Sequence, residues 1–401
     1  MTAANLANIA PMAPAETDVT DVTDVTGRSP AFVVPGDIDD ETVPSGGNTY
    51  DRRVCRALTA AGRPMRELAI AGTWPRPDAA ARDRLTRALA GLADHTAVLF
   101  DGIVACGVPE IIEPAARRLR IAVLVHLPLA DEIGLAPETA ADLDDRERAT
   151  LRAAHMVVAT SGPTARRLRE RHGLAAGRVT WVPPGTDPAP LAPGTDGRSR
   201  LVCVAAVTPR KGQDVLVDAL AEVASRLPGL SWSCACVGPV RRDPAYVGRV
   251  RGLIERRGLG DRVRLTGPRT GADLAADYAA ADLVVLPSLA EPYGMVVTEA
   301  LARGLPVLAS AVDGIPDTLG RAPDGSVPGI LVSPGDAPAL AAALGRWLTE
   351  PELRRELRAA ARLRRDALAG WDAAARRWAD LLGRLGQPPG PTSGTAGGRT
   401  A

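Results

Sequence analysis

Lysine is nearly absent from this sequence of 401 residues: the 48 Lys and Arg residues comprise 47 arginines and one lysine, Lys211. Lysine is a compact point charge with rotatable donors, whereas arginine is a wide planar fork. A site shaped for a lysine head would not accept arginine as an equivalent. Chance can also retain a single residue, so the surroundings of Lys211 decide whether it marks an anion site.

Other scarcities exclude whole classes of protein. A net charge of +1 gives no reason to expect a nucleic-acid partner. Five cysteines form an odd set without zinc spacing, which fits a reducing compartment. The sequence has no apolar run of roughly 18 residues and does not begin with a basic-then-apolar signal pattern. We therefore expect a cytoplasmic protein without a transmembrane segment.

One segment leaves membrane contact open. The arginine-rich stretch ARRLRERHG at 165–173 could touch anionic lipid, but it lacks a bulky apolar face. A solvated surface helix is the favoured interpretation, and peripheral membrane contact is not.

Short, continuous apolar runs are what the sequence does contain, and segments of helical periodicity separate them. Continuous apolar strands between helices are typical of parallel sheets covered on both faces. The fold class predicted is α/β, with two Rossmann-like doubly wound parallel-sheet domains facing across a cleft. The predicted strands lie near residues 32, 97, 121, 156 and 179 in the first half and near 201, 231, 263, 283, 306 and 330 in the second.

Composition divides the chain. A Pro/Gly-rich stretch at 183–200 separates two similar halves, and both ends of the chain are poor in core-forming residues. The predicted division is a disordered arm at 1–29, a first domain at 30–190, a second domain at 191–370, a final helix at 371–386 and a disordered tail at 387–401.

The segment TPRKGQD at 208–214 places Lys211 between a strand and a helix that begins near Gln213. Open parallel sheets bind ligands at the carboxyl ends of their strands, and helix N-termini favour anions. We therefore predict that Lys211 and the neighbouring Arg210 face the cleft. An ordinary exposed lysine near a helix start is the alternative.

A second strand end carries two glutamates, in PSLAEPYGMVVTEALARGLPVLAS at 287–310. Glu291 precedes a helix and Glu299 lies within it, at most ~12 Å apart at the helical rise. Between them, Gly294, Met295 and Val296 offer free backbone N–H groups of the kind that bind a diphosphate. This order predicts a carboxylate that accepts hydrogen bonds from sugar hydroxyls, then a cradle for a diphosphate, then a carboxylate that accepts hydrogen bonds from ribose hydroxyls. Two unrelated surface glutamates are the alternative.

Two weaker signals fall in the first half. In PSGGNTYDRR at 44–53, Gly46 and Gly47 would allow a ligand close to the backbone, although a structural turn is about as well supported. His126 ends the strand IAVLV, again at a carboxyl end. A lone histidine is usually packed or solvated, and its position at a strand end makes a functional role an equal alternative.

Motifs of rival nucleotide-binding classes are missing. No GxGxxG follows a strand and no GxxxxGK[ST] occurs, which removes the main support for dinucleotide oxidoreductases and P-loop proteins. The pairs Asp37/Asp39 and Asp142/Asp144 have the spacing of a metal clamp, but we expect both in exposed acidic loops.

Together, these motifs resemble the family-4 retaining glycosyltransferases of the GT-B fold, over most of residues 30–385. The resemblance rests on SGGN, VHLP around His126, AHMVVATSGPTARRL at 154, VTWVPPGTD at 179, TPRKGQDVL at 208 and EPYGMVVTEALARGLPVLASAVDGIPD at 291, in the family's order. The glutamate pair with its glycine is the most specific element.

The resemblance implies a retaining hexosyltransferase. The second domain would bind a UDP- or GDP-sugar as co-substrate, and the first an unidentified acceptor, with a small molecule favoured. Lys211 would neutralise the leaving diphosphate, Glu291 would hold the donor sugar, and Glu299 the ribose. His126 would contact the sugar near the reaction centre.

No metal and no other cofactor is expected, because Lys211, Arg210 and helix amides supply positive charge. One departure is that Ala206 stands where the family often has a phosphate-binding arginine. A GT-B sugar-nucleotide epimerase and a non-catalytic nucleotide-sugar-binding protein remain as alternatives.

Overall fold

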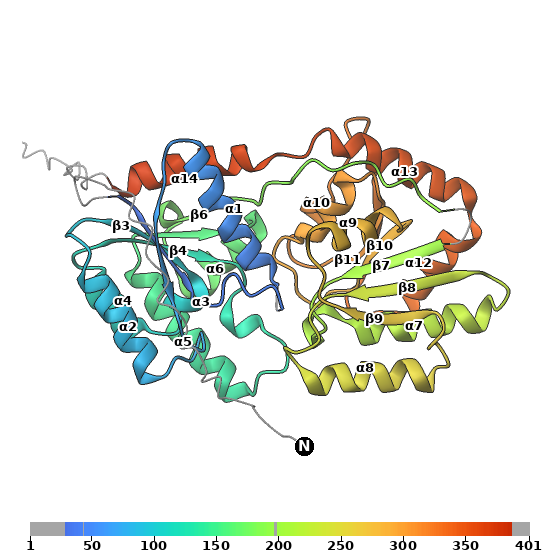
Figure 1. The fold of residues 1–401 in the computed structure, drawn as a ribbon, viewed down its shortest axis with the longest axis horizontal. Helices are drawn as coiled ribbons and strands as arrows, with labels where there is room; N and C mark the ends of the chain where they lie inside the picture. Colours follow the sequence, from blue (N-terminus) through green and yellow to red (C-terminus); the bar gives the residue numbers. More distant parts are fainter. Residues whose placement is uncertain (1–28, 43, 196–198, 387–401) are drawn as a thin grey trace, which may run out of the picture.

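The protein is described here from a computed structural model that covers residues 29–42, 44–195 and 199–386. Most of the predicted arm at 1–29 and the whole predicted tail at 387–401 lie outside the described residues. The described chain forms two halves that lie side by side, each built on a six-stranded parallel sheet (Figure 1). None of the described helices combines the length and the apolar character that crossing a membrane requires.

The first sheet has the strand order β2-β1-β3-β4-β5-β6. Its strands are β1 (Ala31–Pro35), β2 (Arg66–Ile70), β3 (Ala97–Asp101), β4 (Arg120–Val125), β5 (Met156–Ala159) and β6 (Val179–Trp181). The chain leaves β1 in one direction to β2 and then returns to the other side of β1 as β3. Because connections diverge there, a crevice opens between the carboxyl ends of β1 and β3.

The second sheet repeats this arrangement with the order β12-β11-β10-β7-β8-β9. Its strands are β7 (Ser199–Val204), β8 (Trp232–Val237), β9 (Val263–Gly267), β10 (Leu283–Leu286), β11 (Val307–Ser310) and β12 (Gly329–Val332). Here the connections diverge between β7 and β10, so the loops after these two strands border the second crevice.

Helices cover both faces of each sheet, which explains why the central strands are apolar on both faces. The first half contains α1 (Gly46–Ala60), α2 (Ala79–Ala90), α3 (Gly102–Ala105), α4 (Pro109–Ala115), η1 (Leu129–Asp131), α5 (Pro137–Ala153), α6 (Gly162–His172) and η2 (Ala176–Arg178). The second contains η3 (Pro209–Lys211), α7 (Gln213–Arg226), α8 (Pro244–Arg256), α9 (Gly271–Ala279), α10 (Met295–Ala302), α11 (Ile315–Leu319), α12 (Ala337–Thr349) and α13 (Pro351–Arg365).

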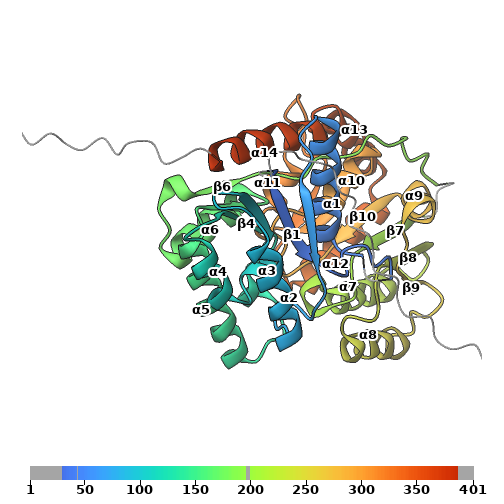
Figure 2. The same ribbon diagram turned by 60° about the vertical axis from the view of Figure 1, so that its left-hand side comes forward.

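The last helix, α14 (Trp371–Leu385), returns to the first half and lies against α1 (Figure 2). Trp378 is fully buried there, and its Nε1 donates to the Tyr50 hydroxyl at 2.8 Å. The Tyr50 hydroxyl in turn donates to the carbonyl of Val182 at 3.0 Å. Two segments of the chain connect the halves, one after β6 and one before α14. They meet where the N–H of Thr186 donates to the carbonyl of Ala369 at 2.9 Å.

Three local expectations need correction. Strand β2 was not predicted, because RELAI at 66–70 is polar and half-exposed at the edge of the sheet. Gly46 and Gly47 lie in the first turn of α1 rather than in a loop, since the Ser45 side chain caps the helix one residue earlier. Asp142 and Asp144 lie on α5 rather than in an acidic loop, and Asp144 is ion-paired with Arg148.

Candidate active site

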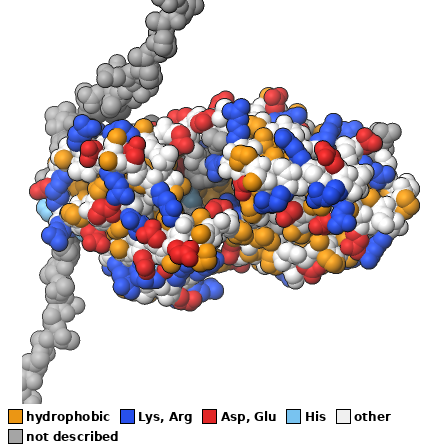
Figure 3. All heavy atoms as spheres, turned by 90° about the horizontal axis from the view of Figure 1, so that it is seen from below, with side chains coloured by type: hydrophobic (Ala, Val, Ile, Leu, Met, Phe, Trp, Pro, Cys, Tyr) orange, Lys and Arg blue, Asp and Glu red, His pale blue; other side chains and the backbone are white. Residues whose placement is uncertain are grey.

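The residues selected from the sequence gather in one cleft between the two halves. Figure 3 shows the molecule hollowed between them, and the cavity there measures about 280 Å³. Its lining includes all ten candidates, namely Gly46, Gly47, His126, Arg210, Lys211, Glu291, Gly294, Met295, Val296 and Glu299. They arrive together because the loops that carry them follow neighbouring parallel strands, whose carboxyl ends meet at the same edge of each sheet.

Lys211 is held at the end of the short turn η3, and the turn geometry depends on the next residue. Gly212 has a left-handed φ of 67°, and a Cβ there would lie 2.3 Å from the carbonyl oxygen of Pro287. Only glycine fits this conformation and this approach. The Lys211 ammonium donates to a Glu291 carboxylate oxygen. Burial lowers the pKa of Lys211 below its usual value, Arg210 adds to this, and Glu291 opposes it.

Glu291 is fixed by several groups on the second half. Its carboxylate accepts from the Ser288 hydroxyl at 3.2 Å as well as from Lys211. Its backbone N–H donates to Asp313 Oδ2 at 2.7 Å. Burial tends to raise the pKa of Glu291, but Lys211 and Arg210 outweigh it, so the pKa lies below the usual value. Glu291 is therefore an ionised acceptor for hydroxyl groups at neutral pH.

The N-terminus of α10 points its amides into the same cavity. Gly294 caps this helix of eight residues with a left-handed φ of 84°, and a Cβ at Gly294 would lie 2.4 Å from Cδ1 of Ile315. The first amides of an α-helix have no partner within the helix. Those of Met295 and Val296 therefore form a cradle suited to an anion.

Glu299 lies one turn further along α10. Its carboxylate accepts from the Tyr278 hydroxyl at 2.7 Å, and the Arg303 guanidinium lies 4.5 Å from the centroid of the Tyr278 ring. Burial raises the pKa of Glu299, although Tyr278 and Arg303 act in the opposite direction. The remaining oxygen of a carboxylate with one fixed donor can accept from a ligand hydroxyl.

His126 faces these groups from the first half. It follows β4, and its Nε2 lies 2.9 Å from Oδ1 of Asp51, which is fully buried on α1. Gly47 packs on the ring, since a Cβ there would lie 3.2 Å from the His126 Cδ2. The Tyr50 ring meets His126 edge to face at 5.4 Å. The glycine in the first turn of α1 thus permits the close contact between α1 and the end of β4.

Two cationic side chains of the cleft were not predicted as ligands. Arg242 follows β8 and Arg269 follows β9, and both line the cavity. Burial lowers the pKa of Arg242, and the nearby Arg210 adds to this. The strand-end rule that selected Lys211 also applies to GPVRRD at 238–243, so the sequence could have predicted Arg242 as a residue of the cleft. Among the residues that the structure describes, every Lys or Arg that lines the cavity comes from the second half.

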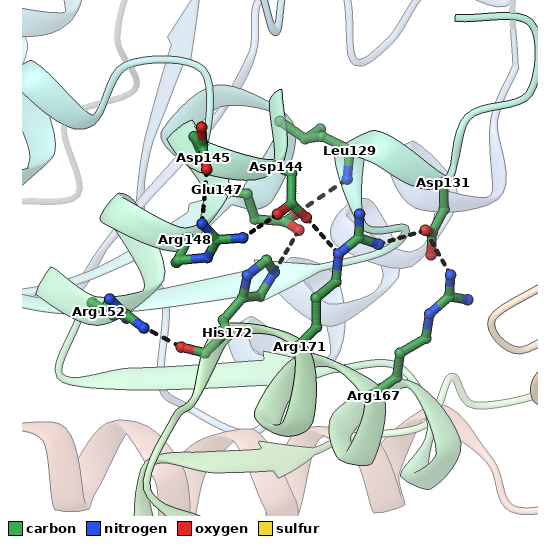
Figure 4. Close-up of polar contacts among 10 residues, drawn as sticks. All are labelled: Leu129, Asp131, Asp144, Asp145, Glu147, Arg148, Arg152, Arg167, Arg171 and His172. Atoms are coloured by element: carbon green, nitrogen blue, oxygen red, sulfur yellow. Dashed lines mark hydrogen bonds and ion pairs between the residues drawn. The ribbon is translucent and has the colours of Figure 1, made fainter. Parts of the chain in front are cut away.

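A second histidine and carboxylate pair lies inside the first half, away from the cleft lining. His172 Nε2 lies 2.9 Å from Glu147 Oε2, and both residues are buried. The other oxygen of Glu147 accepts from the backbone N–H of Leu129 at 3.2 Å. Figure 4 shows Glu147 between His172 and Leu129, with Arg171 bridging Asp131 and Asp144 alongside.

Each pair is close enough to a further carboxylate to be considered for a metal ion. Asp51, Asp101 and His126 have potential ligand atoms within 4.8 Å of one another, and so do Asp144, Glu147 and His172. In both groups the histidine Nε2 is already engaged by a carboxylate. We therefore interpret both as hydrogen-bonded pairs.

Comparison with known proteins identifies the architecture. Residues 193–364 match the family described as "Glycosyl transferases group 1". Sucrose-phosphate synthase from Thermosynechococcus elongatus is similar over 89% of this chain and 99% of its own, at 27% identity and a TM-score of 0.72. WaaG, a glycosyltransferase involved in lipopolysaccharide biosynthesis, is similar over 88% of this chain and 99% of its own, at 19% identity and a TM-score of 0.68. The chain has the GT-B fold.

This GT-B chain also has curated relatives. The D-inositol 3-phosphate glycosyltransferase of Nocardiopsis dassonvillei is 35% identical over 251 residues, which are 58% of this chain and 56% of the relative. The chain thus spans a little over half the length of the relative that it matches. The predicted GT-B fold is confirmed. The sequence match reaches the level of group 1, and membership of family 4 stays a prediction.

Proposed function

We propose that this chain is a metal-independent retaining glycosyltransferase of the family-4 kind, which transfers a sugar from a UDP- or GDP-sugar to an acceptor. The observation that carries the proposal is the wall formed by Lys211, Glu291 and the N-terminus of α10, with His126 opposite. Cationic side chains and helix amides on one wall suit a diphosphate, and the carboxyl groups at its two ends suit sugar hydroxyls.

In the proposed reaction the bond between the anomeric carbon and the diphosphate oxygen breaks, and its electron pair leaves with the diphosphate. The acceptor oxygen forms the new bond on the same face of the sugar, and its proton passes to the departing diphosphate. Lys211 and Arg210 stabilise the charge that develops on the leaving group. Arg242 supplies a further cation to the cavity that Ala206 also lines, at the end of β7 where the family often has an arginine.

The carboxylates orient the donor. Glu291, anchored by Ser288 and Lys211, accepts from sugar hydroxyls, and Glu299, oriented by Tyr278, accepts from the ribose. The acceptor is proposed to be a small molecule bound by the first half. D-inositol 3-phosphate is the first compound to include, because the relatives carry its name. The five free cysteines favour a reducing, cytoplasmic setting.

The test is to incubate the protein with UDP- and GDP-sugars in EDTA and to measure thermal stabilisation and slow diphosphate release. Lys211→Met keeps the length of the side chain and removes its charge. Arg251→Met, on the exposed face of α8, is the matched loss of a cation outside the cleft. We expect Lys211→Met to release diphosphate about a hundredfold more slowly, and Arg251→Met to match the wild type.

Two outcomes would oppose the proposal. Equal stabilisation without release in the wild type and in Lys211→Met would favour a non-catalytic nucleotide-sugar-binding protein. Release that requires added Mn²⁺ or Mg²⁺ would contradict metal independence. The anomeric configuration of the product, read by NMR from a completed transfer, tests retention directly.

A further inference from the structure

The histidine that faces the proposed donor site is not isolated, because it ends a buried chain of acidic groups. His126 contacts Asp51 through Nε2, and this leaves Nδ1 as the ring nitrogen available to a ligand. The side chain of His126 is 19% exposed and that of Asp51 is fully buried. An arrangement of this kind could serve as a general base, so its protonation state decides its chemistry.

A second carboxyl group makes the cluster unusual. Asp101 ends β3 and is 4% exposed, with potential ligand atoms within 4.8 Å of those of Asp51 and His126. One Asp101 oxygen accepts from the N–H of Ile103 at 2.9 Å. The second oxygen of Asp51 is buried without a hydrogen-bond partner among the described residues. Ionising both of two buried carboxyl groups at this distance costs free energy unless a cation lies beside them.

The surrounding groups favour protons within the cluster. Burial raises the pKa of Asp101 to about 7, and Asp51 adds to this. Burial alone would lower the pKa of His126, but Asp51 and, to a smaller extent, Asp101 raise it to about 9. Tyr50 on α1 packs against the ring, and the second half contributes further ionisable groups to the same cavity, namely Arg210, Lys211, Arg242, Arg269, Glu291, Tyr293 and Glu299.

We propose that Asp51 is a positioning residue that holds His126 as a protonated imidazolium, with its Nδ1–H directed to the cleft. His126 then acts as a hydrogen-bond donor and a fixed cation, and it does not act as a base. Asp101 carries the compensating proton below about pH 7. This inference rests on the proposed function for the identity of the ligand. The protonation state itself can be measured without any ligand.

The role of a donor fits a retaining transfer. When the acceptor gives its proton to the departing diphosphate, no enzymatic base is needed. An imidazolium opposite Lys211 adds a positive charge from the first half beside the leaving group, or a donor to a sugar hydroxyl. Neutralising His126 would remove both contributions while leaving Lys211 and Glu291 in place.

The decisive test is an NMR titration of histidine. The chain contains four histidines, so substitution of His126 assigns its resonance directly. In the wild type we expect His126 to titrate near pH 9, while burial and the nearby Arg120 and Arg178 keep the pKa of His155 below its usual value. A wild-type His126 that titrates near its ordinary value of 6.5 would overturn the inference.

Variants separate position from charge. In Asp51→Asn we expect the His126 pKa to fall below 6.5, because only burial and the weaker influence of Asp101 remain. Asp101→Asn, which retains an oxygen to cap Ile103, should lower it by less. Glu147→Gln is the matched control, since it alters the other buried pair and should leave His126 unchanged. An unshifted His126 in both aspartate variants would contradict the proposal.

Diphosphate release supplies the readout that a purely structural role would not affect. In the wild type we expect the rate to fall as pH rises through about 9, and in Asp51→Asn this basic limb should move to lower pH by the shift that NMR measures. A limb that stays in place, despite a shifted titration, would show that His126 is not the donor. A normal NMR result without any release would instead count against the proposed function alone.

Discussion

The first half contains two histidine and carboxylate pairs with the same 2.9 Å separation and different surroundings. His126 and Asp51 lie at the wall of the cleft, beside the buried Asp101. His172 and Glu147 lie in the interior, and Glu147 also holds the N–H of Leu129 (Figure 4). The first pair leaves a ring nitrogen to a ligand and an aspartate oxygen without a partner. The second pair uses both oxygens of its carboxylate.

This difference distinguishes a pair that can contact a ligand from a supporting pair, which stabilises the fold. A carboxylate whose oxygens both accept protein donors stabilises the fold, and little of its hydrogen-bonding capacity is left for a substrate. Glu147 joins α5 to α6 and to the N–H of Leu129, so it stabilises the interior of the first half. The pair at the cleft is the one proposed to set the charge of His126.

The largest expected effect separates the two histidines by activity. His126→Asn should slow diphosphate release on the order of a hundredfold to a thousandfold, because one preorganised donor is lost from the reaction centre. His172→Asn should leave the rate of the folded protein nearly unchanged. The measurement is release per folded molecule, with the folded fraction taken from circular dichroism.

Melting temperature provides the reverse comparison for the same variants. His172→Asn should melt earlier than His126→Asn, because His172 is fully buried whereas His126 borders the cleft. Equal rates in both variants would remove the distinction between the pairs.

Loss of the supporting pair, His172 and Glu147, should lower the unfolding free energy of the protein substantially. Glu147→Ala leaves His172 and the N–H of Leu129 without their acceptor in a buried site, which we expect to cost about 3 kcal/mol of unfolding free energy. Chemical denaturation of Glu147→Ala and Glu147→Gln measures this cost, and the glutamine variant should lose less because it keeps an acceptor. A loss near zero for Glu147→Ala would contradict the supporting role.

The sequence predicted the buried strands of the fold but missed some of its local features. Continuous apolar runs gave the buried strands, since a sheet covered on both faces requires them. Strand β2 was not predicted because RELAI lies at the edge of the first sheet and is largely polar. The start of α1 was not predicted, because Gly46 and Gly47 are also typical of a turn, and the cap from Ser45 is seen only in the structure.

The candidate site shows the same limit. Lys211, Glu291 and Gly294 were predicted because the strand-end rule and local spacing place them. Asp51 carries no such signal, since it lies on a helix and meets His126 75 positions further along the chain. Which side chains face each other across a sheet depends on tertiary packing. Position at a strand end therefore indicated His126, but not the carboxylates that set its charge.

A more graded test follows the pH dependence of stability. His126 has a pKa of about 9 in the folded protein, above its ordinary value of 6.5, so its contribution is complete below pH 6.5 and is lost as pH rises through 9. The folded pKa of Asp101, about 7, exceeds its ordinary 3.8, so the folded state also loses stability between these values as pH rises. Both groups therefore make stability fall with rising pH.

Asp101→Asn should flatten the part of this fall between about pH 4 and 7 and retain the part up to pH 9. Denaturation at closely spaced pH values measures both parts, and Glu147→Gln serves as the control from the other pair. Stability that rises between pH 7 and 9 in the wild type would show that the cluster does not hold the expected protons.

The smallest expected effect lies where the interior network reaches the other half of the molecule. Arg167 on α6 contacts Asp131 at 2.7 Å and Asp313 of the second half at 3.4 Å, beside a cavity of about 170 Å³. Asp313 in turn accepts the N–H of Glu291. The side chain of Arg167 is 46% exposed, so its ion pairs contribute at most about 1 kcal/mol.

Arg167→Met should therefore raise the KM for the nucleotide sugar by less than about sixfold, with kcat preserved, because only the placement of Glu291 is loosened. Arg166→Met, at the neighbouring exposed position of the same helix, is the control and should leave KM unchanged. The difference between the two variants should shrink as salt is added, since exposed ion pairs are screened. A fall in kcat with an unchanged KM would instead place Arg167 in the chemical step. The network around Glu147 would then share the function that the comparison assigns to the pair at the cleft.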